Sequence, residues 1–303
     1  MNQKFYDELR KILPEESIKL NEPMEAHTTF RVGGPADFFV TPGTKDELAG
    51  IIARCRAAQM PYYIIGNGSN LLVSDDGYKG VVIQVYKSMN QIRVTGNRIE
   101  AQAGALLSGI AARALENGLA GFEFAAGIPG TLGGACVMNA GAYGGEMKNV
   151  LKQVTVLSQE GRIFTIPVQK LELGYRTSII AKNGYIVLEA VIELRNGDAQ
   201  EIKTLMDELK EKRVSKQPLE FPSAGSTFKR PEGYFAGKLI QDAGLKGFRV
   251  GGAQVSEKHC GFVINRDHAT AADISELMRQ VSEKVYADSK VILEPEVKRL
   301  GEF

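Results

Sequence analysis

The chain is poor in the residues that build disulfide frameworks and metal sites. Its 303 residues include three cysteines, three histidines and no tryptophan. Cys55, Cys136 and Cys260 are far apart and form no C-x-x-C pair, which argues against a disulfide framework and favours free thiols in a reducing compartment. His259 precedes Cys260, but apart from the distant His268 no further Cys or His lies at ligand spacing. We therefore expect no metal site.

An excess of charge of either sign is also absent. The chain has 37 Lys and Arg against 36 Asp and Glu, a net charge of +1, which argues against a nucleic-acid or membrane-surface partner. The first residues, "MNQKFYDELRKILPEE", carry acids and no long apolar run, so we expect neither a secretory signal nor a transmembrane span, and a cytoplasmic protein. An anionic ligand would have to be bound by local features of the chain.

Periodic apolar residues predict a mixed α and β chain, and its 303 residues are long enough for about two domains. The best candidate for a domain boundary follows "RNGD" at 195–198. There the sequence changes to a charged helix and then to a loop-rich stretch that contains prolines. Helices are predicted at 4–13, from Thr44 onward, and at 106–118, 200–213 and 270–289. Strands are predicted at 62–65, 81–85 and 185–194, with hairpins at 92–103 and 154–166.

A glycine-rich loop, "GNGSN" at residues 66–70, follows the first of these strands. A loop with so few bulky side chains can turn several main-chain N–H groups toward an anion, most plausibly a phosphate. The loop lacks the third glycine of the dinucleotide fingerprint, a short apolar run follows it, and no Walker-type G-x-x-x-x-G-K-[ST] is present. The alternative is a tight loop between two strands that binds no ligand.

A second cluster, at residues 121–145, contains eight glycines. Apolar residues lie between these glycines, and a solvated linker would not need them, so a flexible linker is disfavoured. Small residues let a backbone approach a large, flat or phosphorylated ligand closely. Two such loops suggest a ligand with two demanding parts, a pyrophosphate and a ring system, and flavin adenine dinucleotide (FAD) fits this description.

Seven motifs in one order connect the sequence to a known family. They are "GNGSNLLVSD", "AGIPGTLGGACVMNAGAYGGE", "YRTS", "SAGSTFKRP", "AGKLIQDAGLKG", "GGAQVSEKHCGFVIN" and "LEPEV". In this order they resemble the UDP-N-acetylenolpyruvoylglucosamine reductases, flavoenzymes that make UDP-N-acetylmuramate for bacterial peptidoglycan. The resemblance covers nearly the whole chain and is to the shorter form of the family, which lacks a tyrosine-bearing loop over the substrate.

The resemblance implies an α+β fold. In such proteins a two-subdomain FAD-binding region, of the PCMH or vanillyl-alcohol-oxidase type, precedes an α+β substrate-binding domain. The expected division is 1–80 and 81–197 for the two FAD subdomains, 198–290 for the substrate domain, and 291–303 for a C-terminal segment that returns to the active site. The implied cofactor is non-covalent FAD, and the implied co-substrate is NADPH.

The resemblance also implies the residues that bind FAD. The loop at 66–70 would wrap the pyrophosphate, and residues 127–141 would run beside the flavin. The full expected set is Gly66, Asn67, Gly68, Ser69, Asn70, Gly127, Ile128, Pro129, Gly130, Thr131, Gly133, Gly134, Asn139, Ala140, Gly141, Ile186 and Arg213.

Three residues match the family's catalytic positions. The family's hydride transfer to the enolpyruvyl group leaves negative charge on the carbon that bears the carboxylate. Arg176 would hold that carboxylate, Ser226 would donate the proton, and Glu296, kept protonated by burial, would complete the set. The family also implies substrate contacts for Tyr175, Lys216, Arg230 and His259. Many relatives carry asparagine in place of Arg230, so this position departs from the pattern.

Two other functions are considered. One is another flavoprotein oxidoreductase of the same fold, such as a sugar or lactone oxidase that uses oxygen. Some of those tether the flavin through a histidine in the pyrophosphate loop, where this chain has Ser69 and Asn70. The other is a flavin-binding or nucleotide-binding protein without catalysis, against which the joint presence of Arg176, Ser226 and Glu296 argues.

Overall fold

The computed structural model describes residues 2–303, with long helices where the apolar periodicity predicts them. The Thr44 hydroxyl accepts the N–H of Glu47 at 3.1 Å, and the Glu47 carboxylate accepts the N–H of Thr44 at 3.2 Å, which forms a capping box. The α-helices are α1 (Gln3–Arg10), α2 (Lys45–Ala57), α3 (Leu107–Glu116), α4 (Leu132–Met138), α5 (Ile179–Asn183), α6 (Ala199–Lys216), α7 (Ala236–Asp242) and α8 (Ala271–Ser289).

The strands include both predicted hairpins. The first turns at Gly96, whose φ of +59° suits glycine, and the second pairs Leu157 with Ile163. The strands are β1 (Ile18–Pro23), β2 (Pro35–Val40), β3 (Tyr62–Ile65), β4 (Leu71–Val73), β5 (Tyr78–Gln84), β6 (Ile92–Thr95), β7 (Arg98–Gln102), β8 (Leu119–Ala120), β9 (Gly141–Ala142), β10 (Gly145–Glu146), β11 (Leu151–Leu157), β12 (Ile163–Pro167), β13 (Ile186–Glu193), β14 (Arg195–Asn196), β15 (Arg249–Val250), β16 (Ala253–Val255), β17 (Val263–Asn265) and β18 (Lys298–Leu300).

The chain divides into two compact units that are each built from separated segments. Unit 1 comprises residues 1–19, 39–67 and 81–213, and unit 2 comprises residues 20–38, 68–80 and 214–303. The division passes within β1, β2 and β5, three strands of a four-stranded sheet of order β1-β2-β5-β3 in which β5 pairs with β3. The loop at 66–70 likewise contributes its first two residues to unit 1 and the rest to unit 2.

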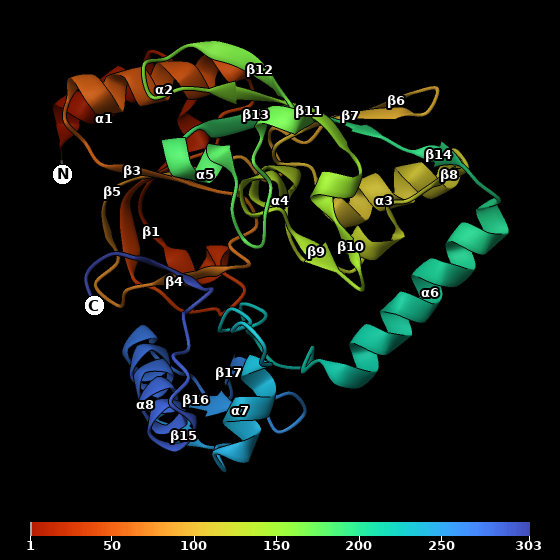
Figure 1. Ribbon diagram of the computed structural model, residues 1–303. Helices are drawn as coiled ribbons and strands as arrows, with labels where there is room; N and C mark the ends of the chain where they lie inside the picture. The colour runs from red at the N-terminus through yellow and green to blue at the C-terminus, as the bar shows by residue number, and fades with distance from the viewer. Residues whose placement is uncertain (1) are drawn as a thin grey trace. The chain divides into compact units, whose positions relative to one another are not determined.

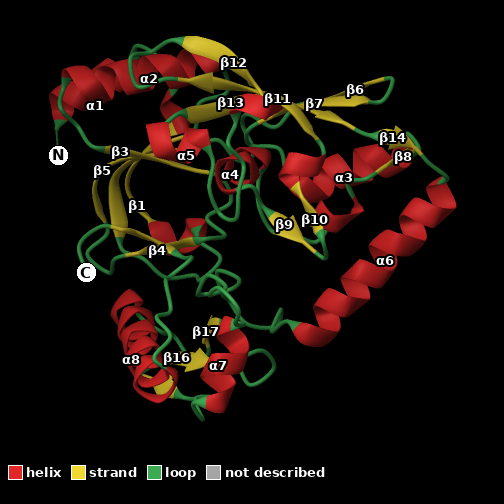
Figure 2. Cartoon of the chain, in the orientation of Figure 1, coloured by secondary structure: helices red, strands yellow, loops and turns green. Residues whose placement is uncertain are grey.

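Unit 1 contains a five-stranded antiparallel sheet of order β12-β11-β13-β7-β6. Helices α3 and α4 pack against its strands (Figures 1 and 2). Their buried side chains include Leu107, Ile110 and Cys136, so the apolar face of α3 that the periodicity predicts lies in the core. Two short antiparallel pairs, β9 with β10 and β8 with β14, also lie in this unit.

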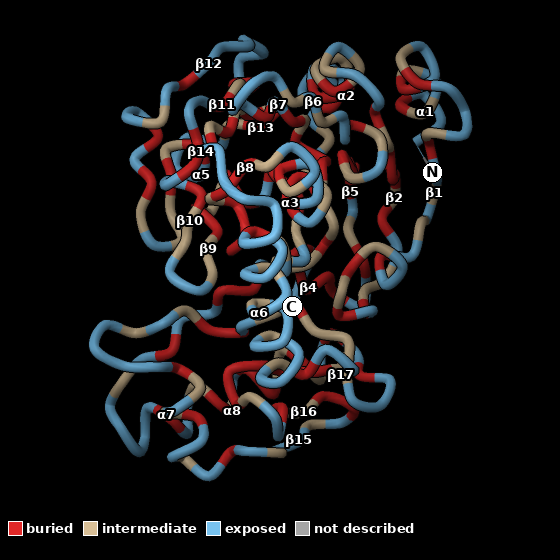
Figure 3. The backbone as a smooth tube through the Cα atoms, turned by 90° about the vertical axis from the view of Figure 1, so that its right-hand side faces the viewer, coloured by how far each residue is buried: buried red, intermediate tan, exposed pale blue. Residues whose placement is uncertain are grey.

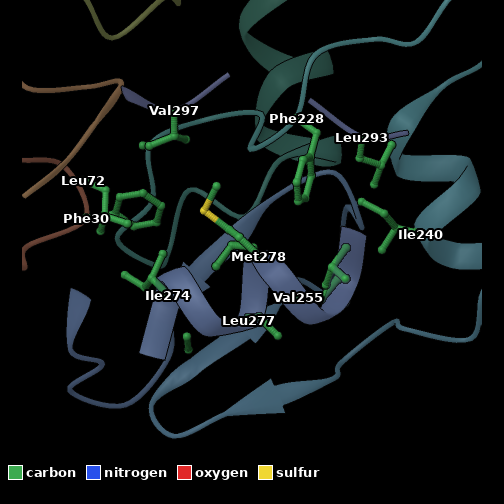
Figure 4. Packing of buried hydrophobic residues seen from close by; sticks show 14 of the residues in the cluster. Phe30, Leu72, Phe228, Ile240, Val255, Ile274, Leu277, Met278, Leu293 and Val297 are labelled. Carbon is green, nitrogen blue, oxygen red and sulfur yellow. The ribbon is translucent and has the colours of Figure 1, made fainter. Parts of the chain in front are cut away.

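Unit 2 is held by one apolar core to which all three of its segments contribute. Helix α8 buries the predicted stripe of Ile274, Leu277, Met278, Val281 and Val285. Figure 4 shows Met278 in the middle of this cluster, with side chains from the first segment, such as Phe30, and from the second, such as Leu72. The strands of the three-stranded sheet β15-β16-β17 lie against α8. Burial of this shared stripe joins sequence segments that are far apart.

Two helices differ clearly in length from the prediction, and three helices, α4, α5 and α7, were not predicted. Helix α1 ends at Arg10, before the expected residue 13, because Pro14 disfavours helical backbone in the residue before it. Helix α6 continues to Lys216 and exposes most of its length, as Figure 3 shows in pale blue. Helix α4 lies within the second glycine cluster, which glycine's low helix propensity led us to expect as loop.

The predicted domains and the two compact units group the chain differently. The sequence suggested continuous segments, with residues 1–80 as one subdomain. In the structure, residues 20–38 and 68–80 contribute to the unit that also contains residues 214–303. The division by sequence into 1–80, 81–197, 198–290 and 291–303 stays a prediction.

Candidate functional site

The two glycine-rich loops meet in unit 1. A Cβ atom placed on Gly66 would lie 2.2 Å from the Thr131 hydroxyl oxygen, so only glycine permits this approach. The Asn67 side-chain amide donates to the Pro129 carbonyl at 3.3 Å. Gly66 and Asn67, the first two residues of the predicted phosphate loop, therefore lie against Pro129 and Thr131 of the predicted flavin loop within this unit.

Arg213 lies against the same surface. A Cβ atom on Gly127 would lie 3.2 Å from Cδ of Arg213, which places this side chain beside the second glycine loop. Partial burial lowers the pKa of the Arg213 guanidinium, and within residues 2–303 it forms no ion pair or hydrogen bond. A partly desolvated cation without an anion favours an anionic ligand at this surface.

Three successive main-chain N–H groups of the first loop are also available to a ligand. The N–H groups of Asn67, Gly68 and Ser69 have no hydrogen-bond partner in the described part of the chain. Gly68 has a φ of +61°, and a Cβ there would lie 2.0 Å from the His27 carbonyl oxygen. Successive free N–H groups in a turn form a concave donor surface suited to an anion.

The end of this loop contacts a predicted catalytic segment within unit 2. The Asn70 side chain donates to the Glu296 carbonyl at 3.2 Å, and the N–H of Lys298 donates to the Asn70 carbonyl at 3.0 Å. Beyond these bonds, β4 and β18 pair in parallel. The structure thus brings together one expected cofactor residue and one expected catalytic residue that are far apart in the sequence.

Several expected cofactor residues have structural bonds in the second glycine cluster. The N–H of Gly133 donates to the Ala103 carbonyl at 2.8 Å, and a Cβ on Gly133 would lie 3.0 Å from Cβ of Ala103. The buried Asn139 side chain donates to Glu146 and Gly174. These contacts give Gly133 and Asn139 a structural role that needs no cofactor. Gly134 is exposed, and Ile186 is buried in β13. Their contacts with a cofactor stay a prediction.

Arg176 occupies a tight turn at residues 174–177 of unit 1. The N–H of Thr177 donates to the Gly174 carbonyl at 3.3 Å, and the N–H of Gly174 donates to the Thr177 carbonyl at 3.2 Å. Arg176 has a φ of +54°, a left-handed conformation that costs a residue with a Cβ roughly 1–2 kcal/mol. Its guanidinium carbon lies 5.2 Å from the ring centroid of Tyr175. Unusual backbone of this kind clusters at functional sites.

Ser226 and Glu296 lie on neighbouring extended segments of unit 2. The N–H of Glu296 donates to the Thr227 carbonyl at 2.8 Å, and Phe228 pairs with Pro295 in an antiparallel bridge. Ser226 is exposed, whereas Glu296 is only 8% exposed. Thr227 itself is buried, and its hydroxyl accepts the N–H of Val263 at 2.9 Å. The short ladder brings the two predicted catalytic residues together.

The remaining expected substrate residues have different surroundings. Lys216 is exposed at the end of α6. Arg230 lies with its guanidinium carbon 4.0 Å from the ring centroid of Phe235, and it donates to the Tyr234 carbonyl at 3.2 Å. Stacking on an aromatic ring and a bond to a carbonyl orient this side chain.

His259 is partly buried in unit 2. Its Nδ1 accepts the N–H of Gly261 at 3.0 Å, and its ring meets the Phe262 ring edge-on at 5.0 Å. Burial lowers the pKa of His259, so the neutral imidazole with its proton on Nε2 is favoured. The histidine can therefore donate from Nε2 to a polar group.

Sequence reasoning missed two residues that support this region. Ser178 and Thr227 are both 0% exposed, and their hydroxyls form the bonds that anchor the segments of Arg176 and Ser226. Ser178 lies in "YRTS", two residues after Arg176, and Thr227 lies in "SAGSTFKRP", directly after Ser226. A hydroxyl residue so close to an expected catalytic residue was the sequence signal that could have identified them. Within residues 2–303, no group of three or more potential ligands could hold a metal ion, and no helix is long and apolar enough to span a membrane.

Comparison with known proteins identifies the chain over its whole length. Residues 36–167 match the family profile described as "FAD binding domain", and residues 217–300 match "UDP-N-acetylenolpyruvoylglucosamine reductase, C-terminal domain". The UDP-N-acetylenolpyruvoylglucosamine reductase of Clostridioides difficile (strain 630) is 54% identical over 99% of both chains. That of Agathobacter rectalis is 52% identical over 100% of both chains.

A solved structure supports the same relationship. The crystal structure of UDP-N-acetylenolpyruvylglucosamine reductase from Thermus caldophilus is similar, with a TM-score of 0.81 and 36% identity, over 94% of this chain and 99% of that chain. This similarity and the FAD-binding match confirm the predicted α+β fold. The chain belongs to the UDP-N-acetylenolpyruvoylglucosamine reductase family.

Proposed function

We propose that this chain uses NADPH and non-covalently bound FAD to reduce UDP-N-acetylglucosamine enolpyruvate to UDP-N-acetylmuramate, a precursor of peptidoglycan. Family membership supports this reaction. The observation that carries the proposal is the surface of unit 1 where the two glycine loops meet beside the uncompensated guanidinium of Arg213.

The residues present on this surface fit FAD. The main-chain N–H of Asn67 can donate to a pyrophosphate at this surface, and Arg213 supplies positive charge beside Gly127. The N–H groups of Gly68 and Ser69, in the part of the same loop that belongs to unit 2, offer further donors. When bound, FAD would supply hydride chemistry, taking a hydride from NADPH and giving it to the enolpyruvyl double bond.

The chain's own groups would stabilise and protonate the reduced substrate. The Arg176 guanidinium would hold the substrate carboxylate with two parallel hydrogen bonds and so stabilise the negative charge that develops beside it. Ser226 would donate its Oγ proton to the carbon that carries this charge. Glu296, largely buried beside the Ser226 segment, would contact the same carboxylate in its protonated form.

Four further residues would bind the rest of the substrate. Lys216 offers an exposed ammonium for the diphosphate. Arg230, oriented by Phe235, offers a second cation, Tyr175 offers an exposed hydroxyl, and His259 offers a ring nitrogen held by its bond to Gly261. NADPH as co-substrate and action in the cytoplasm belong to the same proposal, and three buried free cysteines agree with a reducing compartment.

Non-covalent attachment is supported by where the potential tethering groups lie. Burial raises the pKa of the Cys55 and Cys136 thiols to about 12, so neither is a reactive thiolate, and the pyrophosphate loop itself has Ser69 and Asn70 where a tethering histidine would stand. Acid precipitation should therefore release the yellow colour into solution. Colour that stays with the fully denatured pellet would contradict non-covalent binding.

The absorption spectrum of the purified protein tests the function directly. The oxidised protein should show flavin bands that NADPH bleaches without oxygen, and UDP-N-acetylglucosamine enolpyruvate should then restore them. Restoration by oxygen alone, with no response to the enolpyruvyl substrate, would instead favour an oxidase. A protein whose flavin does not respond to NADPH would contradict the proposed reaction.

A further inference from the structure

We infer that Ser178 and Asn139 are positioning residues for Arg176, which they serve by fixing both ends of its turn to the end of helix α4. The inference deepens the proposed function and rests on the role proposed there for Arg176. Both residues lie in unit 1, as does the whole turn.

Asn139 fixes the first end of the turn. It is 2% exposed and adopts a left-handed conformation, with a φ of +47°, directly after α4. Its Nδ2 donates to the Gly174 carbonyl at 3.2 Å and to Glu146 Oε2 at 2.8 Å, while its Oδ1 accepts the N–H of Lys148 at 2.9 Å. The amide therefore has one defined orientation, with its donor aimed at the first residue of the turn.

Ser178 fixes the second end. It is 0% exposed, its Oγ donates to the Val137 carbonyl at 2.6 Å, and the same oxygen accepts the N–H of Ala181 at 3.2 Å as the N-cap of α5. The turn is thus attached to α4 one residue before Tyr175 and two residues after Arg176. Tyr175, between these attachments, remains 56% exposed.

These attachments matter because the Arg176 backbone is in an unfavourable conformation. A φ of +54° for a residue with a Cβ persists only where the surroundings determine it. With either attachment removed, residues 174–177 can relax toward ordinary backbone and move the guanidinium. A displacement of about 1 Å can cost about 10²-fold in a reaction step that depends on orientation. Only the step that uses Arg176 should be affected.

Ser178→Ala in the flavin-loaded enzyme tests the inference. We expect flavin reduction by NADPH at the wild-type rate and reoxidation by UDP-N-acetylglucosamine enolpyruvate slowed by about 10–10²-fold. Ser178→Thr retains the hydroxyl and should recover most of the rate. Thr44→Ala is the matched control, because it removes the N-cap of α2 in the same unit and should slow neither half-reaction.

A double variant separates positioning from general stability. If Ser178 acts through Arg176, Ser178→Ala should add little to the loss caused by Arg176→Lys, because the two changes remove the same interaction. Losses that multiply, or equal slowing of both half-reactions, would overturn the inference. Asn139→Ser provides a second variant and should also slow reoxidation, whereas the unchanged rate of flavin reduction is required of Ser178→Ala alone, because Asn139 is itself an expected cofactor residue.

The outcomes distinguish this inference from the proposed function. If the enolpyruvyl substrate does not reoxidise the reduced flavin of the wild-type enzyme, the proposed function is refuted. Wild-type turnover with unselective losses in Ser178→Ala would refute only the positioning role. Failure of both Ser178→Ala and Asn139→Ser to fold or retain flavin would also overturn it, because the two residues would then be stability elements.

Discussion

The two units fix their predicted catalytic side chains by different means. In unit 1, Arg176 lies in a strained turn whose ends are bound by the side chains of Asn139 and Ser178. In unit 2, Ser226 and Glu296 lie on extended segments joined by main-chain hydrogen bonds, with Thr227 buried between. Side-chain bonds can be removed by point mutation, whereas a main-chain ladder depends on the core beneath it. Point mutations near the site in unit 1 should therefore mainly slow the reaction, whereas point mutations in unit 2 should mainly lower its free energy of unfolding.

Ser226 should be the exception in unit 2, and it has the largest expected effect. Ser226→Ala removes the proposed proton donor, so reoxidation of reduced flavin by the enolpyruvyl substrate should slow by about 10²–10⁴-fold. FAD binding and flavin reduction by NADPH should persist, since neither needs this proton. Rapid mixing of the reduced variant with substrate measures the step.

Two further variants control this experiment. Ser226→Cys should recover part of the rate because a thiol is a stronger acid of similar reach. Ser223→Ala, on the same segment, should leave both half-reactions near wild type. Reoxidation of the Ser226→Ala enzyme at the wild-type rate would make Ser226 a turn residue and remove it from the reaction.

The core of unit 2 gives the next largest effect. Met278 is 1% exposed in the cluster that joins all three segments of the unit, so Met278→Ala should cost about 2–5 kcal/mol of unfolding free energy. Met89→Ala is the matched change in unit 1, where Met89 is 0% exposed. Hydrogen exchange should show lost protection in unit 2 for the first variant and in unit 1 for the second. Equal losses throughout the chain in both would show that the units unfold as one.

The meeting of the glycine loops in unit 1 can be tested by adding one methyl group. Gly66→Ala would place a Cβ 2.2 Å from the Thr131 hydroxyl, and such overpacking costs about 1–3 kcal/mol. We expect weaker FAD binding, measured by flavin fluorescence on titration. Gly161→Ala is a control, since its Cβ would meet nothing within 4 Å although its φ is positive. Thr131→Ala in the Gly66→Ala background should restore part of the affinity, and no restoration would contradict a steric cause.

Much of the fold could be predicted because its helices and strands carry clear apolar periods. The Thr44 capping box and the buried stripe of α8 are local signals, and the structure confirms both. Helix α4 was missed because two glycines in its first turn lower its helix propensity, while the contact of Gly133 with Ala103 that stabilises it is tertiary. The joining of residues 20–38 and 68–80 with residues 214–303 likewise depends on long-range burial.

For the candidate site, the sequence predicted the residues inside the matched motifs but not the contacts that hold them. Motif matches named Arg176, Ser226 and Glu296, and in the structure the last two lie on hydrogen-bonded segments of unit 2, while their catalytic roles stay a prediction. The position of Arg213 beside Gly127, and the bonds from Asn139 and Ser178, depend on how far-apart segments pack. No local pattern contains that information.

The smallest expected effect is a difference in pH response between the units. All three histidines lie in unit 2, and burial lowers the pKa of His259 from its ordinary value of 6.5. The folded state therefore binds a proton on His259 less readily than the unfolded state does. Unit 2 should have its full stability above about pH 6.5 and lose some as the pH falls through the interval below that value.

His259→Asn should flatten this dependence, because its side-chain oxygen can replace Nδ1 as the acceptor for the Gly261 N–H but cannot be protonated in this range. Susceptibility of unit 2 to proteolysis, measured at about pH 7.5 and about pH 5.5, should rise on acidification in the wild type and rise less in the variant. Cleavage within unit 1 is the internal reference and should change equally in both proteins. An unchanged pH dependence in His259→Asn would show that another group in unit 2 takes up the proton, and that the burial of His259 does not set the difference between the units.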